Sequence, residues 1–410
     1  MKSVIERFLT YVKIPSPSHE GASGSPSSPE QLTMAKVLVD DMKAIGIQDA
    51  RVDEYGYVYG SIPANRENQP SVGLIAHLDV VDGVPCEPMN PRIVKNYDGG
   101  VIEVGNGVRL DPKVFPSLLK CVGKDMIVTD GNTILGADDK AGVAEIMALA
   151  ERLIEHPEIP HGNVKIAFTP DEEIGGGADY LDIPAFGADF AYTVDGGELG
   201  GIEYENFNAA AANVRFHGVS IHPGSAKNRM KNAALIATEF ASLLPAAETP
   251  SHTEGYEGFF HLTDISGDEE NACVHYIIRD HDRQKFEARK KTFASCARFI
   301  NERYGEGTAD AEIKDTYYNM REALASRMDV VDRAFAAFET CGVHAYAEPI
   351  RGGTDGARLS WRGLPCPNLS TGGMNGHGRA ECACAQDMET MVNVLEQLVR
   401  AKSIKSENMP

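Results

Sequence analysis

The sequence of 410 residues contains no apolar run that approaches the roughly 20 residues needed to cross a bilayer. Residues 1–6 also lack a basic segment followed by a long apolar one, so no secretory leader is predicted and we expect a cytoplasmic location. The eight cysteines are too sparse for a disulfide scaffold and lack the paired C-x-x-C arrangement of a zinc ribbon. For Cys382 and Cys384, the closest pair, we expect reduced, structurally incidental thiols rather than a local redox or metal role.

Basic residues are also few, because 39 Lys and Arg stand against 60 Asp and Glu, for a formal net charge of -21. This charge opposes binding to nucleic acid or to an anionic membrane surface, whereas small or cationic substrates remain compatible. With 42% hydrophobic residues the chain can bury a large core, and its length favours two domains over one. We therefore expect a soluble globular protein.

The first half of the sequence alternates between helical and strand patterns, which predicts a layered α/β domain. Ser3 and Glu6 form a capping box, and Gly46 is a typical helix end. The predicted elements are helices after residue 3 and over 29–45, a strand over 72–80, a helix around 143–154, and strands over 164–168 and 190–194.

From about residue 208 the pattern changes to the β-α-β-β-α-β order of a ferredoxin-like α+β domain. Its predicted elements are strands over 210–216, 259–265, 273–278 and 311–317, with helices over 232–244 and 284–303. Helices over 328–341 and 388–401 then resume the first pattern. The sequence thus predicts a larger domain formed by residues 1–207 and 319–410, with residues 208–318 inserted into it.

His77 and Asp79 lie two positions apart on a predicted strand, so their side chains project from the same face. One of them can bind a metal while the other orients the imidazole. A simple hydrogen bond at the strand end fits this pair equally well. The pair supports a metal site only together with further ligand-type residues.

Two pairs of adjacent carboxylates offer such partners. Asp138 and Asp139 precede a helix, where either residue suits a helix cap or a bridging metal ligand, and both roles can coexist. Glu172 and Glu173 follow the strand over 164–168, where one suits a ligand and the other a general base, although an acidic solvated turn is the alternative.

Asp195 and His377 complete a set of side chains that lie at strand ends or in glycine-rich turns. Each alone is compatible with turn chemistry or with a surface histidine. Sites in open α/β sheets form beyond the carboxyl ends of the strands, so the coincidence predicts one shared site. Imidazoles and carboxylates suit a pair of divalent metals such as zinc, and the sequence therefore predicts a metallohydrolase.

Residues of the inserted region and beyond are candidates to contact a substrate. His222 follows a strand and precedes a loop, where a substrate contact and an ordinary hydrogen-bonding role are both compatible. Arg279 and Arg351 are candidates to bind a substrate carboxylate, because guanidinium binds carboxylate bidentately, with a surface ion pair as the alternative.

Taken together, these residues resemble the M20 metallopeptidase family, in particular its peptidase T branch of tripeptide aminopeptidases. The similar stretches are spread over nearly the whole chain. They are residues 76–79, 90–97, 135–142, 168–173, 192–197, 205–208, 222–224, 276–280 and 350–356. A set of this kind is far more specific than any one motif.

The resemblance implies a zinc-exopeptidase-like catalytic domain with the inserted domain as its lid. It also implies two Zn²⁺ ions per chain, with Co²⁺ or Mn²⁺ as substitutes. The implied residue roles are one zinc on His77 and Asp195, the other on Glu173 and His377, Asp138 bridging both, Asp79 supporting His77, Glu172 as general base, and Asn208, His222, Arg279 and Arg351 as substrate-binding residues.

The expected activity is release of the N-terminal residue from tripeptides by metal-activated water. The alternatives are an amidohydrolase, deacylase or dipeptidase acting on N-acyl amino acids or dipeptides, and a non-enzymatic binding protein. The chain departs from the branch at Met374 and Gly376, where relatives often carry tyrosines, and over residues 380–385. The expected partner is a small peptide, bound by a monomer or by a homodimer formed through the lid's edge strand.

Overall fold

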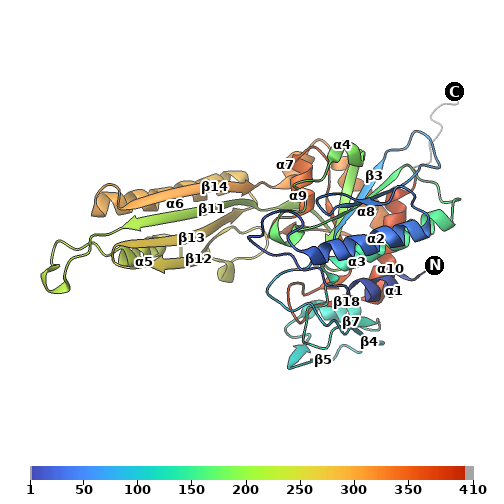
Figure 1. The fold of residues 1–410 in the computed structure, drawn as a ribbon, viewed down its shortest axis with the longest axis horizontal. Coiled ribbons are helices and arrows are strands. Elements are labelled where there is room, and N and C mark those ends of the chain that lie inside the picture. The colour runs from blue at the N-terminus through green and yellow to red at the C-terminus, as the bar shows by residue number, and fades with distance from the viewer. Residues whose placement is uncertain (1, 402–410) are drawn as a thin grey trace. The chain divides into compact units, whose positions relative to one another are not determined.

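A computed structural model describes residues 2–401 (Figure 1). Residue contacts divide the described chain into two compact units. Unit 1 extends to Tyr204 and also includes Ala323–Glu348 and the residues from Thr354 onward, while unit 2 consists of Glu205–Glu322 and Pro349–Gly353. Among the described residues, no helix is long and apolar enough to cross a membrane.

The main sheet has eight strands in the order β1-β2-β8-β3-β9-β16-β10-β15. Its centre is parallel and consists of β8 (Val164–Thr169), β3 (Val72–His77), β9 (Phe190–Gly196) and β16 (Asn368–Ser370). The remaining strands are β1 (Arg51–Val52), β2 (Val58–Ile62), β10 (Gly201–Asn206) and β15 (Tyr346–Ile350). Every residue of β3 is buried, which agrees with the apolar run of a central parallel strand.

Strand β3 is shorter than the predicted strand over 72–80, and the difference has a local cause. After His77 the chain leaves the ladder, and Val80 forms an isolated parallel bridge with Pro17 instead. The buried Asp79 lies in this departing segment. The end of β3 is therefore also the start of a turn that carries polar side chains.

Helix α1 (Val4–Tyr11) begins, and α2 (Pro29–Ile45) begins and ends, where the sequence predicts, whereas α3 (Ala137–Glu155) begins before the predicted range of 143–154. Helix α1 starts at the capping box of Ser3 and Glu6, and α2 ends at Gly46, whose φ of 108° is left-handed. Helix α3 packs against β3, α1 and α10 (Figure 1). The other helices of unit 1 are α4 (Ile183–Phe186), α8 (Met328–Thr340), α9 (Asp355–Trp361) and α10 (Ala385–Val399), while α7 (Met320–Leu324) begins in unit 2 and ends in unit 1.

A small four-stranded sheet in unit 1 was not predicted from the sequence. Its order is β17-β18-β7-β4, with bounds Gly373–Met374, Cys382–Cys384, Met126–Val128 and Arg92–Val94. A hairpin of β5 (Ile102–Gly105) and β6 (Val108–Leu110) and the 3₁₀ helix η1 (Pro116–Cys121) share its apolar core. The start of α10 at Ala385, before the predicted 388, follows directly from the end of β18.

Unit 2 is an antiparallel sheet in the order β12-β13-β11-β14 with two helices packed on it and on each other (Figure 1). The strands are β11 (Asn208–His217), β12 (Phe259–Gly267), β13 (Asn271–Asp280) and β14 (Ala309–Tyr317), and the helices are α5 (Ala233–Leu243) and α6 (Arg283–Tyr304). Burial alternates along β13, so one sheet face carries the core under the helices. The predicted ferredoxin-like order is confirmed; the expected ends at 208 and 318 stay a prediction.

Candidate metal centre

Six side chains predicted for a metal site converge in unit 1, although they come from separate parts of the chain. His77 ends β3, Asp138 lies at the start of α3, Glu172 and Glu173 follow β8, Asp195 lies in β9, and His377 follows β17. Nε2 of His77 lies 2.9 Å from Oδ1 of Asp138 and 3.3 Å from Oδ1 of Asp195. Nε2 of His377 lies 3.1 Å from Oδ2 of Asp138 and 2.9 Å from Oε2 of Glu173.

The parallel sheet explains this convergence. Strands β8, β3 and β9 run side by side in the same direction, and His77 is in register with Thr169, the last residue of β8. The residues that follow these strands therefore meet at one edge of the sheet, where sites of open α/β folds form. The left-handed φ of 62° at His377 belongs to the turn that brings this residue to the others.

The donor atoms fit a pair of metal ions. Ligand atoms of His77, Glu172 and Asp195 all lie within 4.8 Å of one another, and so do those of His77, Asp138 and Glu173. Oε1 of Glu173 is buried and has no hydrogen-bond partner among the described residues, as expected for an oxygen reserved for a cation. Imidazole and carboxylate donors together are the ligands that zinc and similar divalent ions use.

Asp138 and Asp139 differ clearly in what they contact. Asp138 points one oxygen at each imidazole. Asp139 accepts backbone hydrogen bonds instead, from the N–H of His77 and from that of Gly142, both at 3.1 Å. The second bond is the i to i+3 geometry of a helix cap, so the metal-facing and capping positions are divided between the two neighbours.

Asp79 is fully buried behind His77 and is hydrogen-bonded on two sides. Nδ1 of His77 lies 3.1 Å from the Asp79 carbonyl oxygen and 3.3 Å from its Oδ1. The Asp79 carboxylate also accepts the backbone N–H of Glu172 at 3.1 Å and that of Glu173 at 3.2 Å. One side chain thus orients an imidazole and holds the turn that carries both glutamates.

Glu381 is a buried residue of the centre that the sequence analysis missed. Its carboxylate accepts three backbone N–H bonds, from Leu135 at 2.7 Å, Gly136 at 2.6 Å and Asp138 at 3.0 Å. It therefore fixes the loop that presents Asp138. Its only sequence signal is a position shortly after His377, in a segment that departs from the branch.

The two departures near His377 occupy different environments. Met374 lies in β17 with 7% of its surface exposed, within the apolar core of the small sheet. Gly376 lies beside the centre, where an added Cβ would approach Oδ2 of Asp138 to 3.1 Å. A side chain at position 376 would therefore contact the carboxylate between the two histidines.

Burial and mutual repulsion shift the titration of the acidic groups of the centre. Burial raises the pKa of Asp195 to about 7, with Asp138 and Glu173 adding to the shift and His77 opposing it. Burial and the charge of Asp195 raise the pKa of Glu172 well above its usual range. Hydrogen bonds to Asp138 and Glu173 raise the pKa of His377 to about 11. The clustering of carboxylates therefore favours the binding of cations at this centre.

The four residues predicted to bind substrate all lie in unit 2. His222 is exposed and accepts the N–H of Gly224 at the start of η3 (Pro223–Ser225). Asn208 is buried, and its amide nitrogen donates to the carbonyls of Asp280 and His281. Arg279 and Arg351 donate mainly to backbone carbonyls, Arg279 to Ala210 and Ile278, and Arg351 to Thr253, Gly255 and Glu257.

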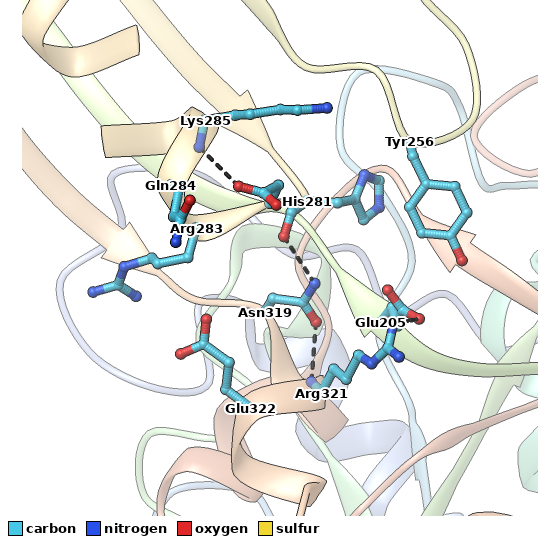
Figure 2. A pocket seen from close by; sticks show the side chains of 10 residues that line it. Glu205, Tyr256, His281, Arg283, Gln284, Lys285, Asn319, Arg321 and Glu322 are labelled. Atoms are coloured by element: carbon cyan, nitrogen blue, oxygen red, sulfur yellow. Dashed lines mark hydrogen bonds and ion pairs between the residues drawn. The ribbon is translucent and has the colours of Figure 1, made fainter. Parts of the chain in front are cut away.

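Unit 2 also contains a pocket of about 610 Å³ whose lining is almost entirely polar. In Figure 2, Asn319 donates to the carbonyl of His281 and accepts from the backbone of Arg321, whose guanidinium pairs with Glu205. None of the four predicted substrate-binding residues lines this pocket. Of its charged groups, Arg321 and Glu205 form an ion pair.

Comparison with known proteins places the chain in a family. The model of "Peptidase family M20/M25/M40" matches residues 129–401. Peptidase T of Clostridium perfringens (strain 13) is 50% identical over 401 residues, covering 98% of this chain and 99% of that protein.

Two solved structures share the fold, each with a TM-score of 0.76 and 22% identity. They are the aminopeptidase PepT from Bacillus cereus, with 97% of both chains covered, and a tripeptidase from Staphylococcus aureus, with 97% of this chain and 96% of that chain covered. Because the family model matches well over half of the residues and a relative is half identical over nearly the full length, the chain belongs to peptidase family M20/M25/M40.

Proposed function

We propose that the chain is a metallo-aminopeptidase that releases the N-terminal residue of tripeptides at a centre of two divalent metals. The observation that carries this proposal is the position of Asp138, whose two oxygens face His77 and His377 at 2.9 and 3.1 Å. One carboxylate between two imidazoles is the arrangement expected of a ligand shared by two ions. The name of the half-identical relative, Peptidase T, supports a peptide substrate.

We assign His77 and Asp195 to one metal, Glu173 and His377 to the other, and Asp138 to both. Zinc suits these donors best, with Co²⁺ or Mn²⁺ as substitutes. Elemental analysis of the purified protein tests the assignment. We expect two ions per chain, and an Asp138→Ala variant that loses both together, because both depend on that carboxylate. Loss of a single ion from that variant would contradict a shared ligand.

Divalent ions at this centre supply Lewis-acid chemistry, since they lower the pKa of a water and polarise a peptide carbonyl. Glu172 lies with His77 and Asp195 within 4.8 Å, so its carboxylate is placed to take the proton of that water. The same carboxyl group would then deliver the proton to the departing amine. Asp79 keeps Glu172 in position through the backbone hydrogen bond.

The Glu172→Ala variant tests the general base directly. We expect it to retain both metal ions and to lose turnover by a factor of about 10² to 10⁴, the usual contribution of a general base. Glu67→Ala, at an exposed glutamate of unit 1, is the matched control and should keep normal turnover. Near-normal hydrolysis by Glu172→Ala with full metal content would remove Glu172 from this role.

Substrate class is tested by comparing free tripeptides with dipeptides, N-acetylated tripeptides and N-acetylated amino acids. We expect cleavage of the first peptide bond of free tripeptides only. Faster hydrolysis of N-acyl amino acids or dipeptides would favour the amidohydrolase or dipeptidase alternative. If the metal-loaded protein cleaved none of these substrates, a binding protein on the same fold would be the better description.

The substrate-binding roles of His222, Arg279, Arg351 and Asn208 also remain part of this proposal. His222 is the most exposed of the four, so we expect His222→Ala to raise KM with little change in stability. The other three side chains hold backbone carbonyls, so their removal should affect stability as well. Cell fractionation and light scattering test the expected cytoplasmic location and the monomer or homodimer.

A further inference from the structure

A second convergence of ligand-type side chains lies in unit 1, outside the centre just described. It consists of Cys121 at the end of η1, Cys384 at the end of β18, and Asp387 in the first turn of α10. All three are buried, with exposed fractions of 2%, 0% and 6%. The two sulfur atoms and a carboxylate oxygen lie within 4.8 Å of one another, and Sγ of Cys121 is 3.9 Å from Oδ2 of Asp387.

We propose that Cys121, Cys384 and Asp387 form a third metal site, specific for a thiophilic divalent ion of the zinc and cadmium class. Zinc binds thiolate sulfur at about 2.3 Å and carboxylate oxygen at about 2.0–2.2 Å, so tetrahedral ligands lie roughly 3.5–3.8 Å apart. The 3.9 Å contact between Cys121 and Asp387 is close to that spacing. The three residues leave one coordination position for a water or another small donor.

The charges around the site suit such an ion. Lys124 holds Oδ1 of Asp387 at 2.5 Å, which leaves Oδ2 directed toward Cys121. Two thiolates and one carboxylate carry three negative charges, and a divalent ion together with the Lys124 ammonium balances them. Binding therefore displaces two thiol protons to solvent, one from each cysteine, without any change of oxidation state.

The two thiols differ in how readily they lose these protons. The hydrogen bond between them lowers the pKa of Cys121 and, together with burial, raises that of Cys384, so the Cys121 thiolate forms first. Cys384 is the N-cap residue of α10, where the helix dipole favours a negative charge. An ion that binds the first thiolate would then promote deprotonation of the second.

The site would connect two parts of the chain that are far apart in the sequence, η1 and the junction of β18 with α10. It joins η1 to β18 and to α10, and β18 follows directly on Glu381, which holds the loop of Asp138. Cys121 comes from η1, Cys384 from the small sheet and Asp387 from the start of α10. The proposed site is therefore a structural clip, separate from the proposed catalytic metals.

Cadmium titration of the full-length protein tests the site, because cadmium bound to thiolates absorbs in the near ultraviolet. The centre of His77 and His377 contains no sulfur ligand and is silent in this assay. We expect the wild type to show a saturable band at one equivalent, with release of two protons per ion. Cys121→Ser and Cys384→Ser should each lose most of the band, and Asp387→Asn should weaken the binding.

Two variants make the outcome unambiguous. Cys366→Ser, at a cysteine buried elsewhere in unit 1, controls for loss of a buried thiol and should keep the full band. His377→Ala removes a ligand of the catalytic centre and should also keep it, which separates this inference from the proposed function. Absence of the band in the wild type, or an equal band in Cys121→Ser, would overturn the proposal. A wild-type protein two hydrogens lighter, with Cys121 and Cys384 in one disulfide, would overturn it as well.

Discussion

Glu145 on α3 tests how burial in the core of unit 1 affects the ionisation of a carboxyl group. The residue has no exposed surface, and neither carboxylate oxygen has a hydrogen-bond partner among the described residues. Burial, with a smaller contribution from the charge of Asp387, raises its pKa well above the usual 4.5. We therefore expect Glu145 to be protonated and neutral in the folded protein at neutral pH.

The sign of the resulting pH dependence follows from linkage. Below pH 4.5 Glu145 is protonated in both states, so it contributes no penalty. Above pH 4.5 the unfolded chain ionises while the folded chain holds the proton, so the free energy of unfolding falls. The loss is about 1.4 kcal/mol for each pH unit and levels off once the pH passes the folded pKa.

The Glu145→Gln variant measures this loss, because its amide cannot ionise in either state. Urea unfolding is followed by the fluorescence of Trp361, the single tryptophan of the sequence, which lies in unit 1. The stability of the variant minus that of the wild type should rise steadily from about pH 4.5 upward. Effects of other buried acids cancel in this difference. Glu155→Gln, at an exposed position on the same helix, controls for the loss of a glutamate from α3. A flat profile for Glu145→Gln would refute the reasoning.

Four further predictions concern the metal centre and unit 2. Glu381→Ala leaves three buried N–H groups without their acceptor, at about 1–3 kcal/mol each, so calorimetry should show a clearly lower melting temperature together with weaker metal binding. In Asp79→Asn, the new side-chain N–H would face a backbone N–H that a carboxylate oxygen accepts in the wild type. We therefore expect kcat to fall by a larger factor than the metal content of the protein. Chelation should lower the melting temperature reversibly, because each ion previously present at 100 times its Kd contributes about 2.7 kcal/mol to the free energy of unfolding. Arg351→Ala releases the carbonyls of residues 253–257, and hydrogen exchange should accelerate there alone.

Much of the fold was predictable because it depends on local signals. The capping box at Ser3 sets the start of α1, and Gly46 ends α2 with a left-handed backbone. The central strands could be recognised as short apolar runs, and in unit 2 the structure shows alternating burial along β13. Each of these signals lies within a few residues of the element that it defines.

The small sheet was missed because its strands have only two or three residues, too few for a two-residue period to be recognised. Its pairings also join distant parts of the chain, such as Ala383 with Ile127. For the same reason, the sequence did not indicate the cluster of Cys121, Cys384 and Asp387. The sequence pointed to Cys382 and Cys384 as neighbours, whereas the structure brings Cys384 next to Cys121.

For the candidate site, the sequence predicted the residue types well, and the contacts of the supporting residues were beyond its reach. Adjacent residues such as Asp138 and Asp139 carry the same local signal, so only the three-dimensional contacts show which one faces the imidazoles. Glu381 has no motif of its own, because its partners are backbone N–H groups about 245 positions away in the sequence. Backbone partners leave no side-chain pattern.

The supporting carboxylates explain why the centre should depend so strongly on cations. Asp79, Asp139 and Glu381 are all nearly or fully buried, and each accepts backbone N–H groups of the segments that present His77, Asp138 and the two glutamates. These bonds hold the ligands in place before any ion arrives, which lowers the cost of binding. They also place acidic groups behind the ligands. Burial raises the pKa of Asp139 well above its usual range and that of Glu381 to about 7, so bound cations would favour the charged forms of both. Rigid positioning and affinity for cations therefore come from the same side chains.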